Sequence, residues 1–207
     1  MRRLRYNRQE AVQYLSDQCP SLAAFIRHFG PLKLKVEQPQ DLFSALSEAI
    51  VYQQLSGKAA ATIHGRFRAL FENSQPDAAG AEGISISELR AVGLSQNKAL
   101  AIQDLARKSL DGSLAPMRRI NRMSDAEVME NLVQVRGIGP WTAQMVLIFN
   151  LGRPDVMPAA DLGIQKGVQV IYRMKSLPKP DQVLRKTQHL APFRSAASWY
   201  FWRVVDG

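Results

Sequence analysis

The sequence has little of several features that define other protein classes. Cys19 is its only cysteine, so neither an internal disulfide nor a cysteine-ligated iron–sulfur cluster can form within the chain. Its three histidines, His28, His64 and His189, stand far apart and show no metal-ligand spacing. No apolar run reaches the length of a membrane span, and the amino terminus carries charge without the apolar stretch of a signal peptide. We therefore expect a protein of a reducing cytoplasm, or of the nucleus if the source is eukaryotic, with no membrane partner.

Strand-like alternation is also missing, whereas helical periodicity runs through the chain. The pattern predicts an all-α fold of about ten short helices with short connections. Residues 31–39 are expected as an extended linker and residues 73–83 as a turn-rich surface loop. The expected helices cover residues 8–18, 21–29, 42–54, 58–71, 87–92, 96–109, 124–135, 140–151, 162–174, 180–190 and 194–204.

The charge balance is strongly basic. Lysine and arginine number 27 against 18 acidic residues, which gives a net charge of +9 and a sequence pI of about 10.0. Such an excess suits a polyanionic partner, because each phosphate contact releases condensed counterions. A basic surface that binds nothing is the alternative, and charge alone does not separate the two.

The segment from Leu132 to Ala143 is the most informative part of the chain. It reads Leu-Val-Gln-Val-Arg-Gly-Ile-Gly-Pro-Trp-Thr-Ala, so one predicted helix ends, two glycines turn the chain, and a second helix begins at once. Glycine permits the tight turn and lets a ligand approach the backbone, while the N–H groups at the start of a helix suit a phosphate oxygen. A plain helix–helix turn is the alternative, but one glycine usually suffices for that. The full pattern therefore favours contact with DNA.

This pattern resembles the hairpin of the helix-hairpin-helix superfamily of DNA glycosylases, which is followed by a Gly/Pro-rich loop and an aspartate. The resemblance implies phosphate contacts from three backbone amides, those of Gly137, Gly139 and Thr142. It also implies an alkali-metal ion, Na⁺ or K⁺, on three hairpin carbonyls, those of Val133, Val135 and Ile138. No cofactor is required for the expected reaction.

The resemblance also points to one carboxylate. In the family, a proline-rich loop ends in an aspartate that starts a helix, with an aliphatic residue three positions later. Asp161 and Ile164 fit this pattern, whereas Pro158 stands at the corresponding position after Asp155. We therefore expect Asp161 to be catalytic, although an aspartate in this place is also an ordinary helix N-cap. The two roles are compatible.

The expected chemistry needs only one carboxylate. Breaking the bond between a sugar and a base builds positive charge on the sugar, which a fixed carboxylate stabilises. No second catalytic acid is evident, and a base alkylated on a ring nitrogen is already cationic and leaves without being protonated. The expected substrates are therefore alkylated purines of the 3-methyladenine and 7-methylguanine type.

Strand-cleaving members of the superfamily carry a lysine just before the Thr-Ala of the hairpin, and its amine attacks the sugar. Trp141 stands at that position here. Lys166 lies on the helix that Asp161 starts and is expected to point along that helix rather than into the hairpin. We therefore expect a monofunctional enzyme without AP lyase activity.

Enzymes that act on a base hold it between aromatic or apolar faces after it has left the stack. The AlkA-type branch (3-methyladenine DNA glycosylase II) carries P-[FWY]-R-S followed by a tryptophan seven residues after the serine, and residues 192–195 with Trp202 match this layout. By this resemblance Trp202 lines the base pocket opposite Asp161, and Trp141 and Met145 complete the expected pocket. Packing in the core is the alternative for aromatic residues of a terminal helix.

The residues Gln53-Gln54-Leu55-Ser56 lie between two predicted helices and are expected as an exposed turn. Family members push such a turn into the minor groove, where it fills the gap left by the flipped nucleotide. Gln54 or Leu55 would be the wedge, with Ser56 beside it. Burial of Leu55 in the core is the alternative.

The resemblance implies a two-lobed helical fold with the active-site cleft between the lobes. The expected lobes are a central bundle of residues 42–148, which includes the hairpin, and a second lobe of residues 1–41 plus 149–207. The expected partner is double-stranded DNA that contains damaged bases, bound by a monomer. Two alternatives remain: a non-catalytic helix-hairpin-helix DNA-binding module, and a glycosylase for other damaged or mismatched bases. Asp161 argues against the first, while Cys19 and Trp141 argue against the iron–sulfur and lyase members of the second.

Overall fold

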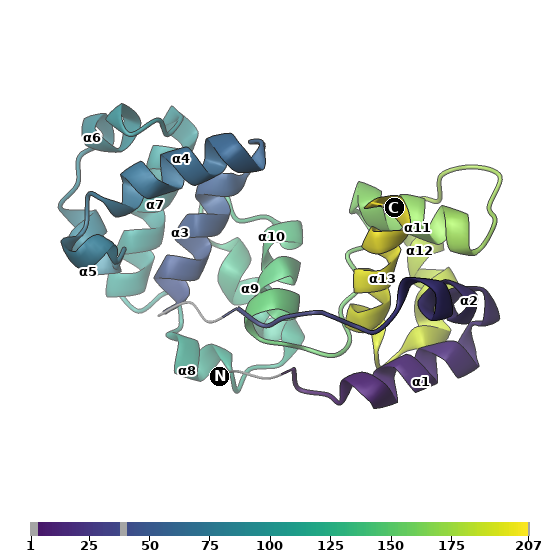
Figure 1. Ribbon diagram of the computed structural model, residues 1–207. Coiled ribbons are helices and arrows are strands. Elements are labelled where there is room, and N and C mark those ends of the chain that lie inside the picture. The colour runs from purple at the N-terminus through teal and green to yellow at the C-terminus, as the bar shows by residue number, and fades with distance from the viewer. Residues whose placement is uncertain (1–3, 38–40, 207) are drawn as a thin grey trace. The chain divides into compact units, whose positions relative to one another are not determined.

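The computed structural model describes residues 4–37 and 41–206, and these residues form helices joined by loops (Figure 1). No strand occurs in either range, so the all-α class expected from the sequence is confirmed. The chain divides into two compact units, which we call the hairpin unit (Pro39–Ala143) and the terminal unit (Met1–Gln38 with Gln144–Gly207). The corresponding boundaries expected from the sequence are residues 42 and 148. None of the described helices has both the length and the apolar character needed to cross a bilayer.

The hairpin unit is built around α7 (Gln96–Leu110), a central helix whose apolar residues Ala99, Ile102 and Leu105 are fully buried. It packs against α3, α5 and α6. The order of elements is α3 (Leu42–Tyr52), α4 (Gly57–Arg68), the 3₁₀ turn η1 (Glu72–Ser74), α5 (Ala78–Glu82), α6 (Ile86–Ala91), α7, α8 (Met117–Ile120), α9 (Asp125–Val133) and the start of α10 (Pro140–Met145).

The terminal unit is centred on the pair α11 (Leu162–Ile171) and α13 (Arg194–Asp206). Gly167 lets these helices approach closely, because a Cβ atom at this position would overlap the backbone carbonyl of Phe201. The other elements are α1 (Arg8–Gln18), α2 (Pro20–Phe29), the π-helical turn η2 (Val146–Asn150), α12 (Pro180–Thr187) and the 3₁₀ turn η3 (Gln188–Leu190).

Most helices begin where local capping chemistry predicts. Ser124 and Glu127 form the expected capping box at the start of α9, in which each side chain binds a backbone amide at the helix start. Asp41 caps α3 through its bond to the amide of Ser44. These starts depend on residues three apart in the sequence, so they are readable without the tertiary structure.

The structure departs from the sequence analysis in its shortest elements. The loop expected over residues 73–83 contains α5, which Asp77 caps by accepting a hydrogen bond from the amide of Gly80. The four-residue α8 was not expected. The helix expected over residues 140–151 changes to π-helical geometry after Met145. Elements of about one turn are too short for a 3.6-residue apolar period to show.

Candidate functional site

The connection between α9 and α10 is a tight turn that uses its two glycines differently. Gly137 has a φ of +79°, which side chains rarely adopt, and a Cβ atom here would lie 3.2 Å from the Cβ of Ala101. No atom lies within 4 Å of the position that a Cβ on Gly139 would take. Gly137 is therefore required by the backbone, whereas Gly139 leaves an open approach to the start of α10.

The backbone amides of this connection differ in whether they are hydrogen-bonded. Within the described residues, we find no acceptor for the N–H groups of Gly137, Gly139 and Thr142. By contrast, Ile138 donates to the carbonyl of Val135 at 3.0 Å and Ala143 donates to that of Gly139 at 3.1 Å. The three amides singled out by the sequence pattern are thus the ones left for an external acceptor such as a phosphate oxygen.

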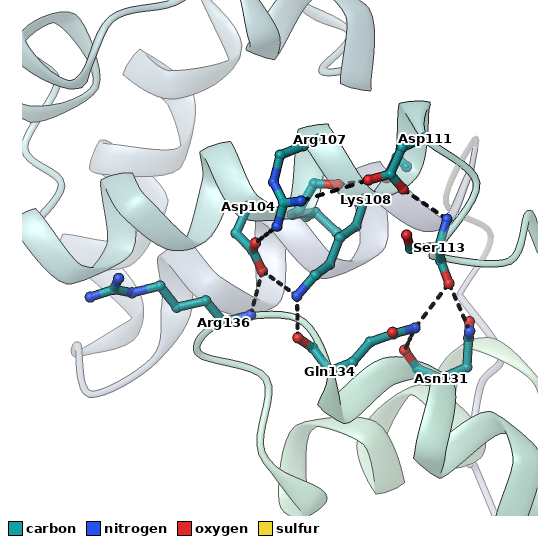
Figure 2. Close-up of polar contacts among 10 residues, drawn as sticks. Asp104, Arg107, Lys108, Asp111, Ser113, Asn131, Gln134 and Arg136 are labelled. Atoms are coloured by element: carbon teal, nitrogen blue, oxygen red, sulfur yellow. Dashed lines mark hydrogen bonds and ion pairs between the residues drawn. The ribbon is translucent and has the colours of Figure 1, made fainter.

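Two residues of α7 hold the hairpin turn in place (Figure 2). Asp104 accepts a hydrogen bond from the backbone amide of Arg136 at 2.8 Å, and it accepts a second one at the same distance from Lys108. The ammonium group of Lys108 also donates to the carbonyl of Gln134. Burial alone would raise the pKa of Asp104, but its bonds from Arg136, Lys108 and Arg107 outweigh that effect and hold the pKa at about 2.

A second set of contacts ties the end of α9 to the loop before α8 (Figure 2). The carbonyl of Ser113 accepts hydrogen bonds from the side-chain amides of Asn131 and Gln134, at 3.2 and 2.9 Å. The side-chain oxygen of Asn131 in turn accepts from the amide of Ala115 at 3.0 Å. The residues before the two glycines are therefore fixed on both sides. None of these residues belongs to a known motif, so no role was expected for them from the sequence.

The turn Gln53–Ser56 lies against the hairpin. Gln54, Leu55 and Ser56 are all exposed, so Leu55 is not part of the core. Gln54 has a left-handed φ of 56°. The side-chain amide of Gln53 donates to the carbonyl of Gly137 at 2.9 Å and to the hydroxyl of Thr142 at 3.4 Å. The structure thus brings together two segments that the sequence analysis singled out separately, through a residue to which it gave no role.

In the terminal unit, Asp161 occupies the N-cap position of α11. Its Oδ1 atom accepts two hydrogen bonds of 2.9 Å, one from the amide of Ile164 and one from the indole N–H of Trp202. Its own amide donates to the carbonyl of Pro158 at 2.9 Å. The carboxylate is therefore held in one orientation by the start of its own helix and by a residue from α13.

Trp202 lies beside Asp161 and is bonded to it, rather than opposite it as the sequence analysis expects. The reason is Gly163, where a Cβ atom would lie 2.9 Å from the Cδ1 atom of Trp202 and 3.0 Å from the Oδ1 atom of Asp161. The missing side chain lets the indole edge reach the carboxylate. One face of the indole packs on Phe149, with a centroid distance of 5.8 Å and an interplanar angle of 27°. Trp199 is 6% exposed and belongs to the core.

The loop that precedes Asp161 is tied to the beginning of α13. Arg194 forms a bidentate ion pair with Asp155, with distances of 2.6 and 2.7 Å. Ser195 donates its amide to the carbonyl of Pro154 at 2.9 Å, and its hydroxyl accepts from the amide of Val156 at 3.0 Å. The Arg-Ser pair of the sequence motif therefore holds the loop that carries Asp161. Asp155, which fails the catalytic pattern, has a structural role instead.

The remaining expected residues lie in both units. Trp141 is 47% exposed and belongs to the hairpin unit. Met145 is half-buried and belongs to the terminal unit, as do Asp161 and Trp202. Lys166 is exposed on α11. Among the residues that the structure describes, no group of three or more histidine, cysteine, aspartate or glutamate side chains is placed to hold a metal ion.

The sequence and the fold both match known proteins. Residues 48–193 match the family described as HhH-GPD superfamily base excision DNA repair protein. A protein of Schizosaccharomyces pombe named DNA-3-methyladenine glycosylase 1 is 36% identical over 168 residues, which cover 81% of this chain and 74% of that protein. A Bacillus subtilis protein named putative DNA-3-methyladenine glycosylase YfjP is 31% identical, and the match covers 89% of this chain and 65% of that protein.

A solved structure shares nearly the whole fold. The Schizosaccharomyces pombe 3-methyladenine DNA glycosylase Mag1, in complex with abasic DNA, superimposes with a TM-score of 0.85 at 33% sequence identity. The superposition covers 94% of this chain and 95% of that one.

Proposed function

The chain belongs to the HhH-GPD superfamily of base excision DNA repair proteins, and from this membership we propose that it is a DNA glycosylase that removes alkylated purines. The substrates would be bases of the 3-methyladenine and 7-methylguanine type. The observation that carries the proposal is Asp161, a carboxylate held by Ile164 and Trp202 at the start of α11. It stands in a chain whose relatives are named 3-methyladenine glycosylases.

In this proposal the hairpin binds the DNA backbone. The amides of Gly137, Gly139 and Thr142 have no acceptor among the described residues, and the space beside Gly139 is open. Amides at the start of a helix donate well to phosphate oxygens. The net charge of +9 adds a sequence-independent attraction to duplex DNA. Neither feature reads base edges, so the protein would bind many sequences and select its target by the lesion.

Asp161 would act on the sugar. As the bond between C1′ and the base breaks, its electron pair leaves with the base and positive charge develops on the sugar. A carboxylate beside C1′ stabilises this charge and orients the water that then adds to it. A ring-alkylated purine is cationic before the bond breaks, so it leaves as a neutral base without a proton from the enzyme. The hydrogen bonds from Ile164 and Trp202 would fix the carboxylate for this task.

We also propose that base release is not followed by strand cleavage. Trp141 occupies the position at which lyase members of the superfamily carry a nucleophilic lysine, and an indole cannot form a Schiff base. Lys166 is exposed along α11. Water would therefore be the nucleophile, and the product would be an intact strand with an abasic site.

Backbone carbonyl oxygens can bind an alkali-metal ion, because in proteins they replace the hydration shell of K⁺. Ligands of this type are present in the hairpin, as the carbonyls of Val133, Val135 and Ile138. The carbonyl of Val135 accepts one hydrogen bond, from Ile138, and keeps a second lone pair. Within the described residues, the carbonyl of Ile138 in the turn accepts no backbone bond, and that of Val133 accepts none from outside α9. A bound Na⁺ or K⁺ would supply positive charge close to a phosphate.

The proposal is tested by base release from matched duplexes. Each duplex carries one base: 3-methyladenine, 7-methylguanine, hypoxanthine, ethenoadenine, 8-oxoguanine or undamaged guanine. We expect 3-methyladenine and 7-methylguanine to be released as free bases, while undamaged guanine stays in the DNA. Release of 8-oxoguanine alone would assign a different lesion class, and release of nothing would leave a DNA-binding module.

A further inference from the structure

The exposed turn Gln53–Ser56 is attached to the rest of the hairpin unit at its first residue. Gln53 ends α3 with a φ of −52° and a ψ of 131°, and Gln54 follows in the left-handed region with a φ of 56°. The next two side chains, Leu55 and Ser56, are exposed. The conformation that presents these side chains therefore depends on how Gln53 is held.

The side chain of Gln53 is held by the hairpin itself. Its Nε2 atom donates to the carbonyl of Gly137 at 2.9 Å and to the hydroxyl of Thr142 at 3.4 Å. Gly137 and Thr142 are also two of the three hairpin residues whose amides have no acceptor among the described residues. One glutamine thus binds the same two residues whose amides would bind phosphate. Thr142 is only 4% exposed, so its hydroxyl has little access to water as a substitute partner.

The backbone of Gln53 is held by α7. The ammonium group of Lys98 donates to the carbonyls of Val51 and Gln53, both at 2.7 Å, and so satisfies groups that the end of α3 leaves without a helical partner. Burial lowers the pKa of Lys98. Because α7 also holds the hairpin through Asp104 and Lys108, the turn and the hairpin share one rigid support.

We propose that Gln53 is a positioning residue that couples the phosphate-binding hairpin to the exposed turn. When the hairpin binds the DNA backbone, Gln53 holds Gln54 and Leu55 in position to enter the gap left by a flipped base. The inference rests on the proposed function, since only an enzyme that flips bases needs such a wedge. The coupling passes through two hydrogen bonds and requires no movement of α7. It makes phosphate binding and base flipping one event instead of two.

The test replaces Gln53 by methionine, which has a similar length and cannot donate to a carbonyl. The matched control is Gln103→Met, which removes a comparable bond from a side-chain amide to the carbonyl of Ile84, 3.2 Å long, in the same unit. Two readouts are needed. The first is the fluorescence of 2-aminopurine placed next to the lesion, which rises when a neighbouring base leaves the stack. The second is single-turnover release of 7-methylguanine.

We expect Gln53→Met to reduce both the fluorescence rise and release from duplex DNA by about tenfold, because the variant loses both hydrogen bonds that Gln53 donates to the hairpin. Affinity for undamaged duplex should change by less than about threefold, because the hairpin amides that bind phosphate remain. A lesion placed in an unpaired bulge, which is already unstacked, should restore the rate of release. Gln103→Met should match the wild type in every assay.

The two readouts separate this inference from the proposed function. Release of alkylated bases by the wild type, with unchanged flipping and release by Gln53→Met, would overturn the coupling and leave the glycosylase assignment intact. A wild type that flips but releases no base would refute the glycosylase and still measure the coupling. Equal losses of flipping and release in Gln53→Met and Gln103→Met, together with lower melting temperatures, would mean that Gln53 only stabilises the fold.

Discussion

The indole N–H of Trp202 and the backbone N–H of Ile164 donate to the same oxygen of Asp161, each at 2.9 Å. Both contacts are therefore made to Oδ1, and both resist rotation of the carboxylate. One comes from the helix that Asp161 starts and the other from the carboxyl-terminal helix. This relationship makes Trp202 a positioning residue for Asp161 in the proposed reaction, whatever else its ring contacts.

Replacing Trp202 by phenylalanine should separate this bond from packing. A phenyl ring can still pack on Phe149 but cannot donate to Asp161, so we expect an intact fold and a loss of about tenfold or more in 7-methylguanine release. Trp199→Phe changes an indole of the same helix whose ring packs in the core, so it should affect stability more than the rate. Excision by Trp202→Phe at the wild-type rate would show that the hydrogen bond from Trp202 does not position Asp161 for the reaction.

Asp161→Asn is the most direct test of the carboxylate. Asparagine caps helices about as well as aspartate, so the melting temperature should hold. In the proposed reaction this carboxylate stabilises positive charge on the sugar, so its loss should lower single-turnover release of 7-methylguanine by about a hundredfold or more. The slow-leaving 7-methylguanine is required, because 3-methyladenine departs too easily unaided.

The control for that variant is Asp41→Asn, at another helix start where an aspartate binds the amide of the third residue along. It makes the same chemical change at a cap in the hairpin unit and should leave base release unchanged. If Asp161→Asn also retained full activity, Asp161 would be a helix cap and nothing more.

Because Trp141 stands where lyase members carry a lysine, we expect that no covalent intermediate forms with the DNA. Borohydride added during the reaction should trap no protein–DNA adduct, while alkali should reveal abasic sites in the same sample. A trapped species would contradict the monofunctional assignment. Its loss in Lys166→Ala would then identify the nucleophile.

Gly163 should tolerate no side chain, for a local reason. A Cβ atom would lie 2.9 Å from Trp202 and 3.0 Å from Asp161, so Gly163→Ala should push the indole off the carboxylate and slow base release by about tenfold. Gly65→Ala, on an exposed part of α4 with no atom within 4 Å, should instead stabilise the protein by about 0.5–1 kcal/mol and leave the rate alone. Equal activity in both variants would contradict the close packing of Trp202.

Asp104 gives the protein a pH-dependent contribution to stability. Its pKa is about 2 in the folded chain against 3.8 for the free side chain, so the stabilisation is present above pH 3.8 and is lost as the pH falls through 2. Asp104→Asn should therefore lower the unfolding free energy by about 1–2 kcal/mol at pH 7 and by progressively less in acid.

Chemical denaturation at pH 7 and at successively lower pH values measures this difference between Asp104→Asn and the wild type. Asp111→Asn, which alters an exposed carboxylate of the same cluster, is the control and should have a smaller effect. If Asp104→Asn lowered the unfolding free energy by the same amount from neutral to acid pH, the charge of Asp104 would not be what stabilises the hairpin.

The amino-acid sequence by itself determined the helical class, most helix limits and the residues to examine. Helical periodicity, the Ser124–Glu127 capping box and the left-handed turn at Gly137 depend on residues within a few positions of one another. Asp161 and the hairpin amides could be identified in the same way, because the family motif also consists of residues close together in the sequence. The elements that escaped, α5 and α8, are too short to show a period.

Only the tertiary structure decided how these residues are held. Trp202 reaches Asp161 across 41 positions of the sequence, and Gln53 reaches Gly137 across 84. The first contact exists because Gly163 leaves room beside the N-terminus of α11 and Gly167 lets α13 approach. The second exists because Lys98 and Asp104, both on α7, fix the end of α3 and the hairpin turn. Such distances are set by which helices pack together, and no spacing within the sequence encodes them.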